Sequence, residues 1–323
     1  MQHSGTTPKP IGTAPKKRRA RSPAPPREKK KKIREDRVQR TERRRTRWFI
    51  LPSFLGVAVF FIAPFFVVIY HSLIDNPVTA NFVGLDNFFA LLKNAAFKRA
   101  ATNTAAFSAI AVPLAVILPL LFAILLMQKL PLKSFFRTVL ISPYMVPIAS
   151  VVLIWEVLFH YNGAVNDFIA IFGVDKIDWL KSEYCQVVVI LLFLWKNLGY
   201  FMILFMAALN NIPQTLLEVA DVEGASAAHK FFKIKLRYLS PTILFVTILA
   251  IINSFKVFRE VFLLTGEYPY EGLYMLQHFM NNMFLGLDYQ RLSAAAIIMA
   301  LAMIVLIALL FAIENWFGRD VEG

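Results

Sequence analysis

Apolar runs of about 20 residues recur along this chain of 323 residues, and each is long enough to cross a lipid bilayer as a helix. Lipid offers no partner to unpaired backbone groups, so open sheets are excluded at that depth. The runs also lack the alternating pattern of a membrane β-barrel. With 57% hydrophobic and only 17% charged residues, the chain is more apolar than ordinary soluble domains. The sequence therefore predicts an all-α, polytopic integral membrane protein.

The apolar runs predict six membrane-spanning helices in a transmembrane domain that covers residues 48–317. The six helices are expected at roughly residues 48–73, 103–127, 139–159, 185–209, 239–263 and 292–317. Bent or unwound helix is expected near Pro113, Pro119, Pro143 and Pro147, which lie in the second and third runs. Residues 318–323 are expected to form a short C-terminal segment.

The formal charge of +14 lies entirely in the N-terminal tail. Residues 1–48 contain 18 Lys and Arg residues and four acidic ones, and the rest of the chain is neutral overall. Residues 1–47 hold few large apolar side chains, so we expect this tail to be disordered. A basic block directly before a first span is typical of a cytoplasmic end and attracts anionic lipid. Nucleic-acid binding is the weaker interpretation of runs such as Lys29–Lys32, and no nucleic-acid partner is expected.

The tendency of basic residues to lie on the cytoplasmic side also predicts which loops face the cytoplasm of a bacterial-type plasma membrane. With the N-terminus inside, residues 128–138 and 210–238 and the C-terminus are cytoplasmic. Residues 74–102, 160–184 and 264–291 then face outward. These outer loops are long and half apolar, so we expect short interfacial helices in them.

One polar, charged segment, about residues 210–240, separates the fourth and fifth apolar runs. Pro213 suits a first helical position, because its missing N–H would lack a partner there anyway. Small and apolar residues such as Ala220 follow at helical spacing, and Gly224 then permits a turn. Apolar and basic residues follow up to Pro241. The pattern predicts a helix–turn–helix at the inner membrane face, with an ordinary amphipathic surface loop as the alternative.

The spacing within this segment resembles the EAA loop of ABC-importer permeases. The matching positions are Glu218, Ala220, Gly224, Ala225, Ile234 and Leu236. Two positions depart from the motif, since Val219 replaces the middle alanine and Arg237 stands where a proline is usual. Without that proline, we expect the second helix to run on toward Pro241.

A second resemblance lies after the first apolar run. Residues 81–88, with the sequence NFVGLDNF, and the pair Asn103 and Thr104 are similar to a signature of carbohydrate-importer permeases. The similarity covers roughly residues 48–317. It implies the fold of a type I ABC-importer permease and the import of a sugar or oligosaccharide.

This resemblance implies an assembly in which the chain itself performs no catalysis. It implies a second, homologous permease, a dimer of ABC ATPases that binds ATP and Mg²⁺, and an extracytoplasmic solute-binding protein. No cofactor is expected in this chain. The residues implied to couple ATPase motion to alternating access are Glu218, Val219, Ala220, Asp221, Glu223, Gly224 and Ala225.

Polar residues within the spans are candidates for the solute path, because they are costly in lipid and usually face a cavity or each other. Amides and aromatic rings suit a sugar, and the candidates are Tyr144, Trp195, Asn197, Tyr200 and Asn253. The same residues also fit plain interhelical hydrogen bonding. Lys256 and Glu260 are expected to pair with each other, because they stand four residues apart on one helix face.

Other function classes find little support in the sequence. It has no Gly-rich phosphate loop, no G-x-S-x-G and no His pair at metal-ligand spacing. The five histidines are scattered, and each is expected at a surface or interface, whereas Cys185 is expected to be a small buried side chain. The alternatives are a gradient-driven secondary transporter or channel, an ABC permease for a non-sugar solute such as glycerol phosphate, and, more distantly, a membrane-bound interaction protein.

Overall fold

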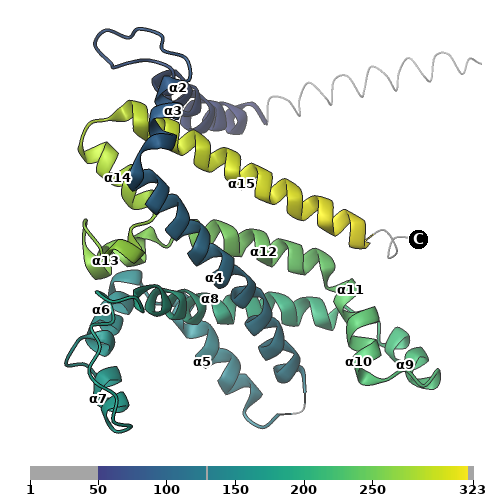
Figure 1. Cartoon of the computed structure of the whole chain (residues 1–323). Helices are drawn as coiled ribbons and strands as arrows, with labels where there is room; N and C mark the ends of the chain where they lie inside the picture. Colours follow the sequence, from purple (N-terminus) through teal and green to yellow (C-terminus); the bar gives the residue numbers. More distant parts are fainter. Residues whose placement is uncertain (1–49, 129, 319–323) are drawn as a thin grey trace, which may run out of the picture. The chain divides into compact units, whose positions relative to one another are not determined.

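The computed structural model describes residues 50–128 and 130–318 (Figure 1). The chain divides into two compact units, residues 1–63 and 64–323. The tail predicted to be disordered, residues 1–47, lies outside the described residues, as does most of the C-terminal segment. In the first unit, the described part is helical and includes a π-helical turn, η1 (Ala58–Ile62).

Most of the described residues are helical and no strand occurs among them, which confirms the predicted all-α class. An isolated antiparallel bridge joins Ile74 to Phe82. After η1, the elements in chain order are α2 (Ala63–Ser72), α3 (Asp86–Lys93), α4 (Ala95–Met127), α5 (Lys133–Met145), α6 (Ile148–Phe159), α7 (Ala164–Ala170), α8 (Cys185–Asn210), α9 (Gln214–Val222), α10 (Ala227–His229), η2 (Lys230–Lys235), α11 (Leu236–Tyr238), α12 (Ser240–Phe255), α13 (Phe258–Thr265), η3 (Glu271–Leu273), α14 (Leu276–Leu285) and α15 (Tyr289–Gly318).

Six helical stretches in the described part of the chain are long and apolar enough to span a membrane, as predicted. They are Ile50–Ser72, Ala95–Met127, Ile148–Ala170, Cys185–Asn210, Ser240–Thr265 and Tyr289–Asn315. The second helix begins eight residues before its predicted start. Its N-cap is Asn94, whose side-chain oxygen accepts hydrogen bonds from the backbone N–H groups of Ala96 and Phe97.

The third predicted span, residues 139–159, is wrong as a single helix. The chain forms α5 and α6 instead, separated at Val146 and Pro147. Proline lacks a backbone N–H and forces the preceding residue out of the helical region, and Val146 is accordingly extended, with φ −77° and ψ 135°. Pro113, Pro119 and Pro143 lie inside continuous helices, so only the proline at 147 breaks one.

The core of the second unit forms where α4 and α12 pack against α8 (Figure 1). Phe107 of α4 meets Phe193 of α8 edge to face at 5.6 Å, and the hydroxyls of Ser108 and Ser254 lie 2.9 Å apart between α4 and α12. Where α5 crosses α8, a Cβ at Gly199 would lie 2.1 Å from the carbonyl oxygen of Leu140. Only a glycine permits this approach of the two backbones.

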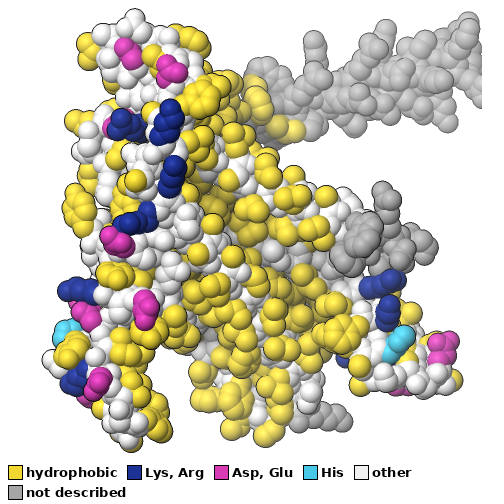
Figure 2. Space-filling view, in the orientation of Figure 1, with side chains coloured by type: hydrophobic (Ala, Val, Ile, Leu, Met, Phe, Trp, Pro, Cys, Tyr) yellow, Lys and Arg dark blue, Asp and Glu magenta, His cyan; other side chains and the backbone are white. Residues whose placement is uncertain are grey.

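Apolar side chains cover much of the outward surface of the spans (Figure 2). More than half of the most apolar 18-residue window of α8 is buried, at 56%, whereas none of the corresponding window of α15 is. A soluble protein rarely exposes so large an apolar surface, and lipid is its natural solvent. The helix at the centre of the packing is therefore α8.

The residues of the second sequence signature fasten the loops to the helices. Asn87 donates hydrogen bonds to the carbonyl oxygens of Ser72, the last residue of α2, and of Ile74. Asn103 on α4 donates to the carbonyl oxygens of Glu271 and Tyr274, and the neighbouring Thr104 hydroxyl accepts from the Leu276 N–H. These polar residues satisfy backbone groups at helix ends, which explains why that spacing is needed.

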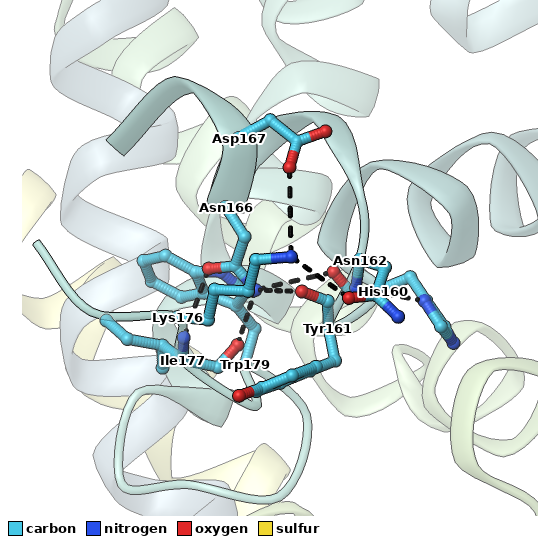
Figure 3. Close-up of polar contacts among 8 residues, drawn as sticks. All are labelled: His160, Tyr161, Asn162, Asn166, Asp167, Lys176, Ile177 and Trp179. Carbon is cyan, nitrogen blue, oxygen red and sulfur yellow. Dashed lines mark hydrogen bonds and ion pairs between the residues drawn. The ribbon is translucent and has the colours of Figure 1, made fainter. Parts of the chain in front are cut away.

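The predicted short helices occur in all three long loops, as α3, α7 and α14 with η3. A single amide organises the loop around α7 (Figure 3). Asn166 is fully buried, and its NH₂ donates to the carbonyl oxygens of Tyr161 and Ile177 at 2.9 and 2.8 Å. Its oxygen accepts from the Ile177 N–H and from Nε1 of Trp179 at 2.9 Å.

The expectation that every histidine lies at a surface or interface is wrong for His278. This side chain on α14 is only 1% exposed, and Phe258 meets its ring edge to face at 4.6 Å. Neither ring nitrogen has a hydrogen-bond partner among the described residues. Burial lowers the pKa of His278 to about 4, so the ring is neutral at ordinary pH. Cys185 is buried, as predicted.

Candidate functional site

The segment from Pro213 to Leu239 forms the predicted helix–turn–helix and is called here the 213–239 segment. Helix α9 is its first arm, and α10, η2 and α11 together form the second. Ser226 caps the second arm by accepting a hydrogen bond from the His229 N–H at 3.2 Å. The helix does run on past Arg237, as expected from the missing proline. Helical bonds cross the junction with α12, from the Leu239 N–H to Lys235 and from the Ile243 N–H to Leu239.

Gly224 ends α9 in a Schellman motif. The Ala225 N–H donates to the Ala220 carbonyl at 2.9 Å, and the Gly224 N–H donates to the Asp221 carbonyl at 3.1 Å. The motif requires a left-handed residue, and Gly224 has φ +76°. Apart from its two chain neighbours, a Cβ placed on Gly224 would meet no atom of the described residues within 4 Å. The glycine therefore satisfies the backbone conformation and leaves the outer surface of the turn open.

The first arm exposes an apolar face that was not among the predicted features of this segment. Leu216, Val219 and Val222 stand three residues apart, and their exposed fractions are 38%, 56% and 90%. Residues three apart share a helix face, so this spacing was readable from the sequence. We call these three residues the α9 apolar face. An exposed apolar surface outside the spans is typical of a docking site.

The other predicted coupling residues border this face. Glu218, Asp221 and Glu223 are exposed, Ala225 is half-buried, and Ala220 is buried beneath them. Asp221 forms an ion pair with Lys230 of the second arm, which fastens the two arms together. Acidic side chains gather at the end of the segment, with basic side chains along the rest of it (Figure 2).

A separate cavity of about 430 Å³ opens among α5, α8, α12 and α13. Three of the five predicted solute-path residues line it, namely Tyr144, Asn197 and Asn253. Tyr200 lies behind the lining and stacks on Tyr144, with ring centroids 4.6 Å apart and an interplanar angle of 11°. Trp195 does not line the cavity. It meets Trp155 edge to face at 6.1 Å and is 41% exposed.

The two asparagines also hold helices together. Nδ2 of Asn253 donates to Oδ1 of Asn197 at 3.0 Å, and Nδ2 of Asn197 donates to the Phe193 carbonyl at 2.8 Å. Within the described residues, no donor reaches Oδ1 of Asn253. The Asn197 amide thus uses its oxygen and one N–H within the protein, which fits the interhelical alternative. Oδ1 of Asn253 remains able to accept a hydrogen bond from a hydroxyl group in the cavity.

The predicted pairing of Lys256 with Glu260 is wrong. Glu260 pairs instead with Lys196 of α8, and Nζ lies 2.6 Å from Oε1. The i, i+4 rule holds within one continuous helix, but α12 ends at Phe255 and α13 begins at Phe258. Lys256 falls in the break. Lys256 and Arg259 both line the cavity, and neither forms an ion pair with any other described residue.

Comparison with known proteins agrees with this architecture. Residues 106–323 match the family described as the inner membrane component of binding-protein-dependent transport systems. A trehalose/maltose transport system permease of Thermococcus litoralis is 32% identical over 226 residues, which cover 68% of this chain and 76% of that protein. An sn-glycerol-3-phosphate transport system permease of Escherichia coli is 29% identical, with 86% of this chain and 96% of that protein covered.

Two further matches extend the comparison. An arabinooligosaccharide transport system permease of Halalkalibacterium halodurans is 30% identical over 66% of this chain and 68% of that protein. Among solved structures, a chain of a bacterial ABC transporter involved in the import of the acidic polysaccharide alginate superposes with a TM-score of 0.73. That chain is 22% identical, and the superposition covers 91% of this chain and 99% of that one, so it has the same fold.

Proposed function

Because the chain belongs to the family of inner membrane components of binding-protein-dependent transport systems, we propose that it is the permease subunit of an ATP-driven importer for a sugar, an oligosaccharide or a related polyol derivative. The relatives that cover most of the chain are permeases of trehalose/maltose and sn-glycerol-3-phosphate systems. The observation that carries the coupling role is the α9 apolar face at the end of the 213–239 segment. A gradient-driven transporter would not need such a face.

In this proposal, the 213–239 segment docks into an ABC ATPase subunit on the cytoplasmic side. The α9 apolar face supplies contact area, and Glu218 and Glu223 at its edge fix the register and the choice of partner more than the affinity. Gly224 lets the partner approach the end of α9 closely. ATP and Mg²⁺ bind to the ATPase dimer, and this chain performs no catalysis.

The second arm offers a physical route from the ATPase to the solute. Helical elements follow one another in a run from Ala227 through Phe255, with a turn residue, Leu239, between α11 and α12. One end stands beside the docking turn, and the other carries Asn253 in the cavity lining. The π-helical η2 lies within this run, and such turns are frequent at functional sites. Closure of the ATPase dimer would thus move the cavity end of α12 and change which side of the membrane the cavity faces.

The remaining partners follow from the family. A second, homologous permease completes the membrane domain, and an extracytoplasmic binding protein delivers the solute. Both termini are cytoplasmic, in agreement with the basic tail. The tail contacts anionic lipid and has no nucleic-acid partner.

Thiol chemistry tests this arrangement, because Cys185 is the only cysteine and is buried. In a Cys185→Ala background, Val222→Cys should react with an impermeant maleimide only from the cytoplasmic side. A thiol-to-amine cross-linker at that position should capture the ATPase subunit. The matched control is Phe172→Cys after α7, with an exposed fraction of 70%, which should react only from outside and capture no ATPase. Labelling of Val222→Cys from outside would contradict the proposal.

A further inference from the structure

The cavity among α5, α8, α12 and α13 has an excess of positive charge. Its lining includes three cations, Lys196, Lys256 and Arg259, and one carboxylate, Glu260. Lys196 and Glu260 neutralise each other at 2.6 Å. Two positive charges therefore remain at one cavity, Lys256 from the break between α12 and α13 and Arg259 from the first turn of α13.

Both side chains are exposed in this chain, yet they lie within a segment long and apolar enough to cross a membrane. Lys256 and Arg259 belong to the candidate span Ser240–Thr265, and uncompensated charges within membrane spans are rare and usually functional. On the facing helix α6, the acidic residue Glu156 does not line the cavity, and no described carboxylate lies within 4 Å of either cation. The described residues thus provide no carboxylate that pairs with them.

We propose that Lys256 and Arg259 receive a negatively charged group of the transported solute, a phosphate or a carboxylate. The guanidinium of Arg259 presents paired N–H donors that match either group, and Lys256 adds a point charge beside it. Asn253 and Tyr144 offer polar groups for hydroxyls in the same cavity. At about 430 Å³ the cavity is within the range typical of small-molecule sites. A neutral sugar would leave both cations without a partner.

This inference rests on the proposed function, and it narrows the solute to an anionic sugar or polyol derivative. The test uses the complete transporter in proteoliposomes with matched solute pairs. One pair is glycerol 3-phosphate and glycerol, and the other is a uronic-acid trisaccharide and a neutral trisaccharide. We expect uptake of the anionic member of one pair, and the pair that responds tells phosphate from carboxylate.

The cations are tested by substitution. Lys256→Gln and Arg259→Gln should each lower uptake of the anionic solute about 10- to 100-fold, since each removes one charge-assisted hydrogen-bond donor. The control is Lys93→Gln on α3, which removes an exposed cation far from the lining in sequence and should leave uptake unchanged.

Three results would overturn the inference. The first is uptake of neutral solutes only, at a rate that Lys256→Gln and Arg259→Gln leave unchanged. In that case the transporter remains an ATP-driven importer, so the proposed function survives. The second is failure to transport either anionic solute. The third is loss of the partner permease from the purified complex of either variant, which would assign the cations to the interface between permeases.

Discussion

A side chain at Gly224 should uncouple the transporter while leaving the protein folded. The substitutions are Gly224→Ala and Gly224→Asn. Because φ is +76°, an alanine there costs about 1–2 kcal/mol of backbone strain, whereas asparagine tolerates the left-handed region better. Among the described residues, nothing beyond the two chain neighbours lies within 4 Å of the added Cβ, so packing within this part of the chain is unchanged. Both variants should therefore insert into the membrane normally.

In the proposed assembly, the docked ATPase would add a second cost that backbone strain alone does not predict. Overpacking a close contact typically costs about 1–3 kcal/mol, which corresponds to about 5- to 150-fold weaker binding of the ATPase. If docking decides the effect, Gly224→Asn should be at least as harmful as Gly224→Ala. If backbone strain decides it, asparagine should be the milder substitution.

Gly173 provides the matched control in the loop after α7. Its φ is also +76°, and a Cβ there also meets nothing within 4 Å. Gly173→Ala should therefore carry the same strain without touching the ATPase. The assays are solute-stimulated ATP hydrolysis and co-purification of the ATPase with the membrane subunits. Normal stimulation with Gly224→Asn would refute the reasoning.

Four further changes test other parts of the structure. Gly199→Ala should lower the free energy of unfolding by about 1–3 kcal/mol or more, because the new Cβ would lie 2.1 Å from the Leu140 carbonyl oxygen and would force α5 away from α8. A lower melting temperature in detergent would show this. Asn166→Leu leaves the buried partners of that amide without hydrogen bonds, so the Trp179 fluorescence should shift and the loop should lose about 1–3 kcal/mol of local stability. Lys196→Gln should destabilise the protein by about 3 kcal/mol because Glu260 loses its partner, and adding Glu260→Gln should restore part of the loss in the same melting assay. For His278, the folded pKa of about 4 lies below the unfolded value of 6.5, so the unfolded state binds the proton first as pH falls. Stability should drop by about 2 kcal/mol between pH 7 and 5, and His278→Gln should remove that dependence from melting curves.

The spans and the helix–turn–helix shape of the 213–239 segment were predictable because each depends on local patterns. Apolar run length reports a membrane span directly, and the Gly224 turn needs only one residue able to adopt a positive φ. The break at Pro147 was one of four candidate prolines. Sequence alone does not tell which proline a helix can tolerate, because neighbouring helices can satisfy the backbone groups whose hydrogen bonds the proline removes.

The errors concern contacts between distant parts of the chain. Lys256 and Glu260 have ideal helical spacing, but the break between α12 and α13 leaves Glu260 to a lysine 64 residues away. His278 stands between Gln277 and Phe279 in sequence, and its ring is covered by Phe258 from another helix. The solute-path role of Trp195 stays a prediction, since this residue precedes a lysine that lines the cavity but its own ring contacts Trp155. The direction in which a side chain leaves its helix predicts its contacts only when the neighbouring helix is already known.

Reconstituted transport tests the central claim most directly. The chain is purified with its partner permease, ATPase subunits and binding protein, and solute uptake into proteoliposomes is measured with and without ATP. The account predicts uptake that requires both ATP hydrolysis and the binding protein and is lost with Gly224→Asn. Uptake that persists without ATP and follows an ion gradient would contradict it.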